Sequence, residues 1–74
     1  MKQVSEMPTS GQFVAVYQVS GFDFISIEHL KWSGHELLAR FDLYDSERDA
    51  DYQVWEDADA ENYTYHNATY LIAD

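Results

Sequence analysis

Three segments with strand-forming sequences follow one another closely, and turn-forming residues separate them. The first is β-branched and aromatic on both of its faces, whereas apolar and polar residues alternate in the second and third. The segments span residues 12–19, 22–32 and 36–44, and the separators are Ser20-Gly21 and Ser33-Gly34. Alternation with a period of two is typical of β-strands, because successive side chains of a strand point to opposite faces of the sheet. Short separators that contain glycine favour hairpins. We therefore expect antiparallel strands joined by tight turns.

The third of these segments also fits a helix. Ser33 is followed three residues later by Glu36, which matches a capping box at a helix N-terminus. In a helix that starts there, one face would carry Leu37, Leu38, Phe41 and Tyr44. We favour the strand over residues 36–44 and keep the helix as the alternative.

Residues 46–62 are open to the same two interpretations. Residues 52–55, with the sequence Tyr-Gln-Val-Trp, form a short apolar island that predicts a fourth strand between acidic loops. Alternatively, Ser46 caps a helix that places Ala50, Val54 and Ala58 at helical spacing. We favour the strand, because aspartates and aromatic residues weaken a helix here.

The two ends of the chain complete the expected organisation. Residues 1–11 are polar and contain the one proline, Pro8, so we expect a flexible N-terminal tail. Residues 63–72 are rich in tyrosine and threonine and predict a last strand. Residues 12–74 then form a single compact domain. We expect a mainly β or small α+β fold, a single antiparallel meander of four to five strands with at most one helix.

The chain has 74 residues and no cysteine, so neither a disulfide framework nor a cysteine-based zinc site stabilises it. A hydrophobic content of 46% argues against a disordered chain. Residues 1–6 lack the apolar stretch of a signal peptide, and no apolar run is long enough to span a membrane. We therefore expect a cytoplasmic protein, in the host cytoplasm if a phage encodes it.

The charge is strongly negative and unevenly distributed. Fourteen acidic residues against four basic ones give a net charge of −10, which disfavours direct binding to nucleic acid or to anionic membranes. Residues 45–61 carry eight acids against one base, Arg48, for a local charge of −7. Such a segment is complementary to basic surfaces, which are common on proteins that bind nucleic acid.

Catalytic and metal-binding patterns are weak. The acids from Asp45 to Glu56 partly match a calcium-binding loop, but Ala50 stands where that loop needs glycine. His29 and His35 have no cysteine or carboxylate at the spacing of a metal site. We find no nucleophile motif and no glycine-rich phosphate loop, and a chain this short has little room for a dry catalytic pocket. We expect no enzyme activity, no cofactor and no metal.

These observations favour a small acidic, non-catalytic inhibitor. It would block the basic nucleic-acid-binding surface of a partner protein by charge mimicry, in the style of the DNA mimics and anti-CRISPR proteins made by phages or mobile elements. It would act as a monomer or a small homo-oligomer. The acids would pair with the basic partner, while Tyr52 and Trp55 anchor the contact. The expected partner-binding residues are Asp45, Glu47, Asp49, Asp51, Tyr52, Trp55, Glu56, Asp57, Asp59 and Glu61. The alternative is a structural or accessory β module that self-associates, with the acids serving solubility only.

Overall fold

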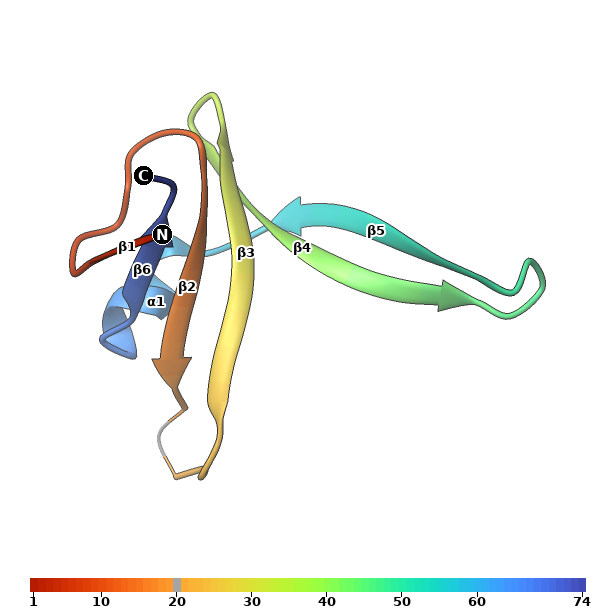
Figure 1. The fold of residues 1–74 in the computed structure, drawn as a ribbon, viewed down its shortest axis with the longest axis horizontal. Coiled ribbons are helices and arrows are strands. Elements are labelled where there is room, and N and C mark those ends of the chain that lie inside the picture. Colours follow the sequence, from red (N-terminus) through yellow and green to blue (C-terminus); the bar gives the residue numbers. More distant parts are fainter. Residues whose placement is uncertain (20) are drawn as a thin grey trace.

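One antiparallel sheet contains all the strands of the computed structural model, which describes residues 1–19 and 21–74 (Figure 1). The elements in chain order are β1 (Lys2–Val4), β2 (Gln12–Gln18), β3 (Ile25–Ser33), β4 (Glu36–Asp45), β5 (Ala50–Asp57), α1 (Ala60–Tyr65) and β6 (Thr69–Ile72). Within these described residues the sheet has six strands in the order β1-β6-β2-β3-β4-β5. The prediction of a mainly β, antiparallel fold with at most one helix is confirmed.

The hairpin predictions are confirmed for the middle of the chain. β3 and β4 are joined by a two-residue turn, in which Ser33 pairs with Glu36 and Gly34 has a positive φ of 61°. A side chain is strained in that backbone region, and glycine is not. β2 and β3 pair over their whole common length, from Gln12 with Lys31 to Gln18 with Ile25. Of the first predicted turn, Ser20 lies outside the described residues. Residues 36–44 are strand and not helix, as we favoured.

The C-terminal segment differs from its prediction. Residues 63–72 were expected to be one strand, but Tyr63 to Tyr65 belong to α1 and the strand begins only at Thr69. The helix starts because Asp59 is an N-cap whose side chain accepts a hydrogen bond from the backbone N–H of Glu61. The strand preference of tyrosine and threonine is overridden because the helix places Tyr63 in the core, where it is 3% exposed.

The order of the strands also departs from a simple meander. After β5 the chain passes through α1 and returns beside β2, where Ala15 pairs with Tyr70. β1 then pairs with the outer edge of β6, so Lys2–Val4 is a strand within the segment that the sequence assigned to a tail. The first and last residues meet at this edge, where the N-terminal amine lies 3.0 Å from the Asp74 carboxylate.

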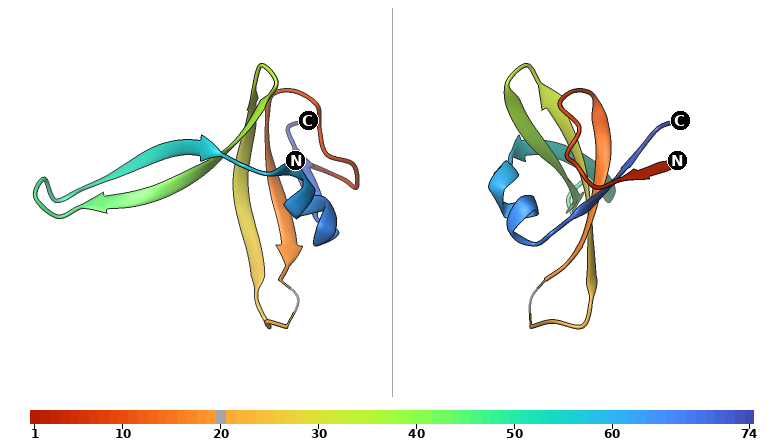
Figure 2. Two further views of the ribbon diagram at one scale, coloured as in Figure 1. Left: turned by 180° about the vertical axis from the view of Figure 1, so that it is seen from behind. Right: turned by 90° about the vertical axis from the view of Figure 1, so that its left-hand side faces the viewer.

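The hydrophobic core lies between the sheet and α1 (Figure 2). Residues at alternate positions of β2, β3, β4 and β6 point to this side and meet Tyr63 of the helix. Leu30 of β3 is fully buried. The buried core consists of Phe13, Ala15, Leu30, Leu37, Ala39, Tyr63, Ala68 and Tyr70. No helix of the described residues is long and apolar enough to cross a membrane.

The outer part of the β4–β5 hairpin departs from this body. β3 pairs with β4 only between Leu30–Ala39 and Ser33–Glu36, whereas β4 and β5 continue to pair as far as Asp45 and Ala50. Beyond Ala39 the two strands therefore run on as a free two-stranded ribbon, which projects sideways in Figure 1. We call residues 41–54 the arm and the rest of the molecule the body.

Candidate partner-binding arm

The arm presents two different faces because its strands alternate. Its first face continues the core side of the sheet past Ala39, but here no helix covers it. Phe41 pairs with Val54 and Leu43 with Tyr52, so four apolar side chains follow one another along this face. Phe41, Leu43 and Tyr52 are 44%, 42% and 47% exposed. We call these four residues the apolar stripe.

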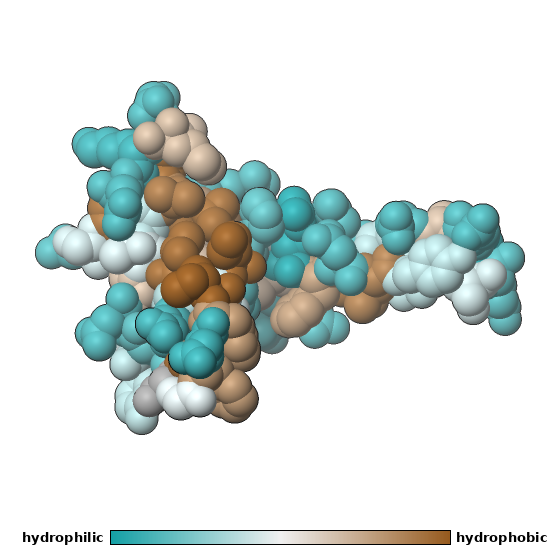
Figure 3. Space-filling model, turned by 60° about the horizontal axis from the view of Figure 1, so that its bottom comes forward, coloured by the Kyte–Doolittle hydropathy of each residue, from teal (hydrophilic) through white to brown (hydrophobic). Residues whose placement is uncertain are grey.

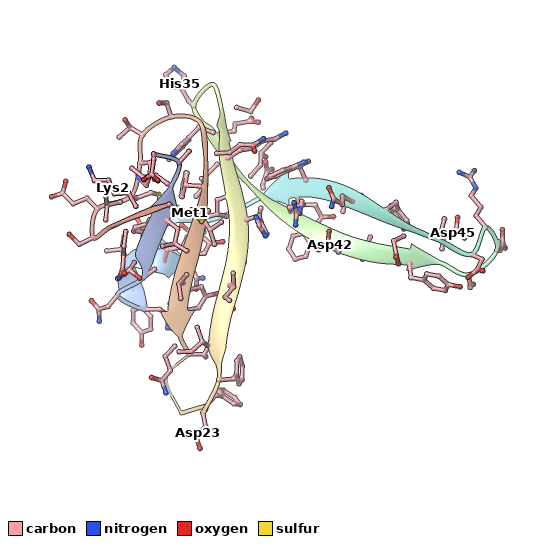
Figure 4. All side chains as sticks on the ribbon, viewed as in Figure 1. Met1, Lys2, Asp23, His35, Asp42 and Asp45 are labelled. Carbon is pink, nitrogen blue, oxygen red and sulfur yellow. The ribbon has the colours of Figure 1, made fainter. Side chains whose placement is uncertain are left out.

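The second face of the arm is polar and acidic. Asp42 pairs with Gln53, and Tyr44 pairs with Asp51. In Figure 4 the side chains of Asp42 and Asp45 mark the inner part and the outer end of the arm. Five acids stand against one base between residues 41 and 54, a net charge of −4. Apolar contact area and negative charge are therefore combined on one narrow ribbon.

The tip of the arm is held by local hydrogen bonds. The side chain of Asp45 accepts a hydrogen bond of 3.0 Å from the backbone N–H of Glu47 and lies 3.6 Å from Arg48. The Tyr44 hydroxyl donates to Asp49, a residue with a positive φ of 49°. That hydrogen bond to a carboxylate raises the pKa of the exposed Tyr44 hydroxyl. The acids at the tip are thus presented on an ordered turn.

The root of the arm is packed against the body. Trp55 is half-buried, and the ammonium of Lys31 lies 4.1 Å from the centre of its ring. This is the geometry of a cation–π contact. Arg40, which pairs with Trp55 across the hairpin, has its Nε 3.5 Å from a carboxylate oxygen of Asp42. Trp55 is therefore engaged within the molecule, at the junction between the arm and the body.

The structure brings some of the ten expected partner-binding residues together and separates others. Asp45, Glu47, Asp49, Asp51 and Tyr52 all lie on the arm. Trp55, Glu56 and Asp57 lie at its root, where Glu56 pairs with Ala39. Asp59 caps α1 and Glu61 stands in the first turn of that helix, so both have local structural roles.

The acids of the arm do not form one regular row. On the side of β5 that carries Asp51, the next alternate positions hold Gln53 and Trp55 before Asp57 follows. The negative charge is instead gathered at the outer end of the arm, with Asp42 added from β4. Sequence reasoning missed Asp42, Phe41 and Leu43 as surface residues. Their alternation in the sequence signalled a strand with one apolar face, which normally predicts burial.

The arrangement does not support a calcium loop over residues 45–56. The first ligand expected of such a loop is Asp45, which pairs with Ala50 at the tip of the arm. The last expected ligand is Glu56, which pairs with Ala39 at the root. Six strand residues separate the two ends by about 20 Å, too far for both carboxylates to bind one ion. Among residues 1–19 and 21–74, no group of three or more histidine, cysteine or acidic side chains is placed to hold a metal.

A second polar cluster lies under the helix and has a structural role. Glu28 of β3 accepts hydrogen bonds from the hydroxyls of Tyr17 and Tyr63, the latter over 3.3 Å. His66 stacks on Tyr17, with ring centres 5.2 Å apart. Burial, together with the Glu28 charge and hydrogen bond, raises the pKa of Tyr63 well above its usual range, and burial likewise raises that of Tyr17. The cluster ties α1 to β2 and β3.

Comparisons with protein-family models, with curated proteins and with solved structures found no match to this chain. What the protein does is therefore inferred from its own residues, and the arm is the feature that most needs an explanation.

Proposed function

We propose that this protein is a small, non-catalytic inhibitor that inserts its acidic arm into the basic nucleic-acid-binding surface of a partner protein. The observation that carries the proposal is the arm itself, a ribbon of net charge −4 that projects from the body with an uncovered apolar stripe. The partner is a nucleic-acid-binding protein, and the arm occupies the position of a nucleic-acid strand.

The energetics of the arm support a binding role. An isolated two-stranded hairpin is marginally stable in water, because it has no third strand or helix to bury its apolar face. Phe41, Leu43 and Tyr52 are each nearly half exposed. Burying the exposed half of each against a partner contributes about 1 kcal/mol per side chain, about 3 kcal/mol in all. Insertion into a groove therefore stabilises the arm as well as the complex.

The charge of the arm selects the kind of partner. Carboxylates at the tip attract lysine and arginine side chains over several ångströms and speed the encounter, while like charges exclude acidic surfaces. Nucleic-acid-binding grooves present such basic side chains in a row and are shaped to admit a narrow, negatively charged strand. The proposed setting is the cytoplasm, that of the host if the inhibitor is made by a phage.

The proposal is tested with two variants of equal charge change. In the arm variant Asp42, Asp45 and Asp51 become Asn and Glu47 becomes Gln, which removes four charges and keeps the side-chain size. The matched control makes the same kind of change at four exposed acids outside the arm, namely Glu6, Asp23, Glu36 and Asp74.

Both variants and the wild-type protein are used as bait in a nuclease-treated bacterial lysate. The bound proteins are washed at about 0.1 M and then at about 0.5 M salt, because the screening of exposed charges increases sharply over this range. We expect the wild-type protein and the control variant to retain the same basic nucleic-acid-binding protein, and added DNA or RNA to displace it. The arm variant should lose it, with an association rate at least tenfold lower. Retention by the arm variant, or equal loss by the control, would show that the arm does not carry binding.

A further inference from the structure

The face of the sheet opposite α1 is apolar and only partly covered, because Val14 is buried while Val16 and Leu71 are partly exposed. Its strongly hydrophobic side chains come from β2, β3 and β6, and the register places Val16 beside Ile27 and Val14 beside Leu71. Ile25 and Ile27 are 57% and 64% exposed. Figure 3 shows the resulting hydrophobic strip along the body, next to the projecting arm. We call this surface, formed by the outward side chains of β2, β3 and β6, the open face.

The charge of the open face is unlike that of the rest of the molecule. Its polar residues in the described strands β2, β3 and β6 are Gln12, Gln18, His29, Lys31 and Thr69, with no carboxylate among them. The whole chain has fourteen acids and four bases. A basic partner therefore finds no carboxylate on these three strands, whereas two copies of this acidic chain can approach through them without bringing carboxylates together.

One end of the open face is hollowed, and exposed aromatic rings stand at the other end. At the β3–β4 end a hollow of about 270 Å³ is lined by Val14, Leu71 and Trp55, among others. At the opposite end, in the β2–β3 connection, Phe22 and Phe24 are 57% and 54% exposed and their rings lie 5.5 Å apart. A cavity of about 150 Å³ is enough to hold one benzene-sized ring, so the hollow can receive a phenylalanine.

The two ends also have complementary charges. Lys31 lies near the hollow, which Arg40 helps to line, and both are basic. Asp23 lies between the two phenylalanines, at the far end of β3 in Figure 4. Counted along the chain, Ile27 stands midway between Asp23 and Lys31. A twofold axis near Ile27 would therefore bring Asp23 of one copy to Lys31 of the other.

We propose that the open face is the interface of a symmetric homodimer, in which two copies pack face to face with their β3 strands antiparallel. A twofold interface uses the same patch on both copies, so each contact is made twice. Phe22 and Phe24 of each copy then enter the hollow of the other. This dimer is separate from the proposed inhibition, because the arm lies outside the open face.

The exposed area is compatible with such a dimer. Ile25, Ile27, Phe22 and Phe24 are each more than half exposed. Each offers about 100 Å², since a large side chain presents about 150–250 Å² in total. Together with the polar residues around them, this approaches the roughly 800 Å² per partner of a standard interface. We expect a dimer that dissociates at low concentration.

The test measures the oligomeric state of the full chain by sedimentation velocity from about 1 to 500 μM. The wild-type protein should shift from monomer to dimer over this range. Ile27→Asp should weaken the dimer at least tenfold, because it places a carboxylate at the centre of both faces. Its matched control is Leu43→Asp, the same change on the apolar stripe of the arm, which should leave the dimer unchanged. Circular dichroism of each variant confirms that the sheet is intact.

A charge exchange tests the antiparallel arrangement directly. Asp23→Lys alone should weaken the dimer severalfold, and Lys31→Asp added to it should restore the affinity. A wild-type monomer at 500 μM overturns the proposal, and so does a dimer that survives Ile27→Asp. Loss of the dimer in Leu43→Asp but not in Ile27→Asp also overturns it, by placing self-association on the arm.

Discussion

Removal of the Tyr63 ring should cost this fold much of its stability, because that ring fills the space between α1 and the sheet. Tyr63 is 3% exposed, packs edge-on against Tyr17 at a centroid distance of 5.8 Å, and donates a hydrogen bond to Glu28. We expect Tyr63→Ala to create a cavity there and to leave Glu28 with one hydrogen-bond donor fewer from the two tyrosines.

The magnitude follows from the buried area. A tyrosine side chain that buries about 200 Å² contributes about 5 kcal/mol at 25 cal/mol per Å², and large aromatic-to-alanine changes in cores cost about 3–5 kcal/mol. At about 0.05–0.15 kcal/mol per residue, the 74-residue chain has a total stability of about 4–11 kcal/mol. Tyr63→Ala should therefore remove at least about a quarter of the free energy of unfolding, and lower the Tm by about 12 °C or more.

The assay is urea unfolding followed by circular dichroism, at one fixed protein concentration for all variants. The matched control is Tyr65→Ala, the same change two residues along the same helix, where the side chain is 78% exposed. It should change the free energy of unfolding by about 0.5 kcal/mol or less. Tyr63→Phe, which keeps the ring and loses the hydroxyl, should cost about 1 kcal/mol. Equal losses for Tyr63→Ala and Tyr65→Ala would refute the packing of α1 described above.

Three further predictions concern local features of the body. Because the pKa values of Tyr17 and Tyr63 are raised on folding, the folded state binds these protons more tightly, so the contribution of these two hydroxyls to stability should be constant below about pH 10 and fall above it; urea unfolding at pH 8 and pH 11 measures this, and Tyr63→Phe should show a smaller fall. Asp59→Ala should cost about 1 kcal/mol, seen as a lower Tm, because it removes the helix N-cap. Gly34→Ala should cost about 1–2 kcal/mol in the same assay because of its positive φ of 61°, and Gly34→Asn should cost less; equal stability of the Gly34→Ala variant and the wild-type protein would contradict that turn.

The strands in the middle of the chain could be predicted because their signals are local. Val14, Val16 and Tyr17 favour extended backbone, and the glycine of the tight turn stands where the φ is positive. The pairing of neighbouring strands then follows from the short connections. The same local rules identified β4 and β5, although a helix competed with the strand in each segment.

The helix and the first strand depend on contacts between distant residues. Residues 63–65 have the composition of a strand, and they form a helix because it places Tyr63 against Tyr17 and Glu28, which are distant in the sequence. The N-cap at Asp59 and the acid in the first helical turn were available as local signals. β1 has three residues, and its partner β6 lies at the other end of the chain, which no local pattern can indicate.

The sequence predicted the acidic composition of the arm, but it did not predict that the hairpin projects from the body. The sequence indicated that residues 45–61 concentrate the charge, and that Tyr52 lies within that segment. The alternation of Phe41 and Leu43 predicts a buried face, whereas the pairing of β3 with β4 ends at Ala39 and leaves that face uncovered. The twist of the whole sheet decides the position at which two neighbouring strands stop pairing. The alternation of residues in the sequence does not encode this position.

The central claim is that the arm contacts the partner, and site-specific photo-cross-linking tests it most directly. One photoreactive residue replaces Ser46 at the tip of the arm, and in a control protein it replaces the exposed His35 at the β3–β4 turn of the body (Figure 4). On irradiation in a nuclease-treated lysate, we predict that position 46 cross-links to a basic nucleic-acid-binding protein, that added DNA or RNA prevents it, and that position 35 gives no such product. Cross-linking from position 35 alone, equally from both positions, or from neither would contradict the claim.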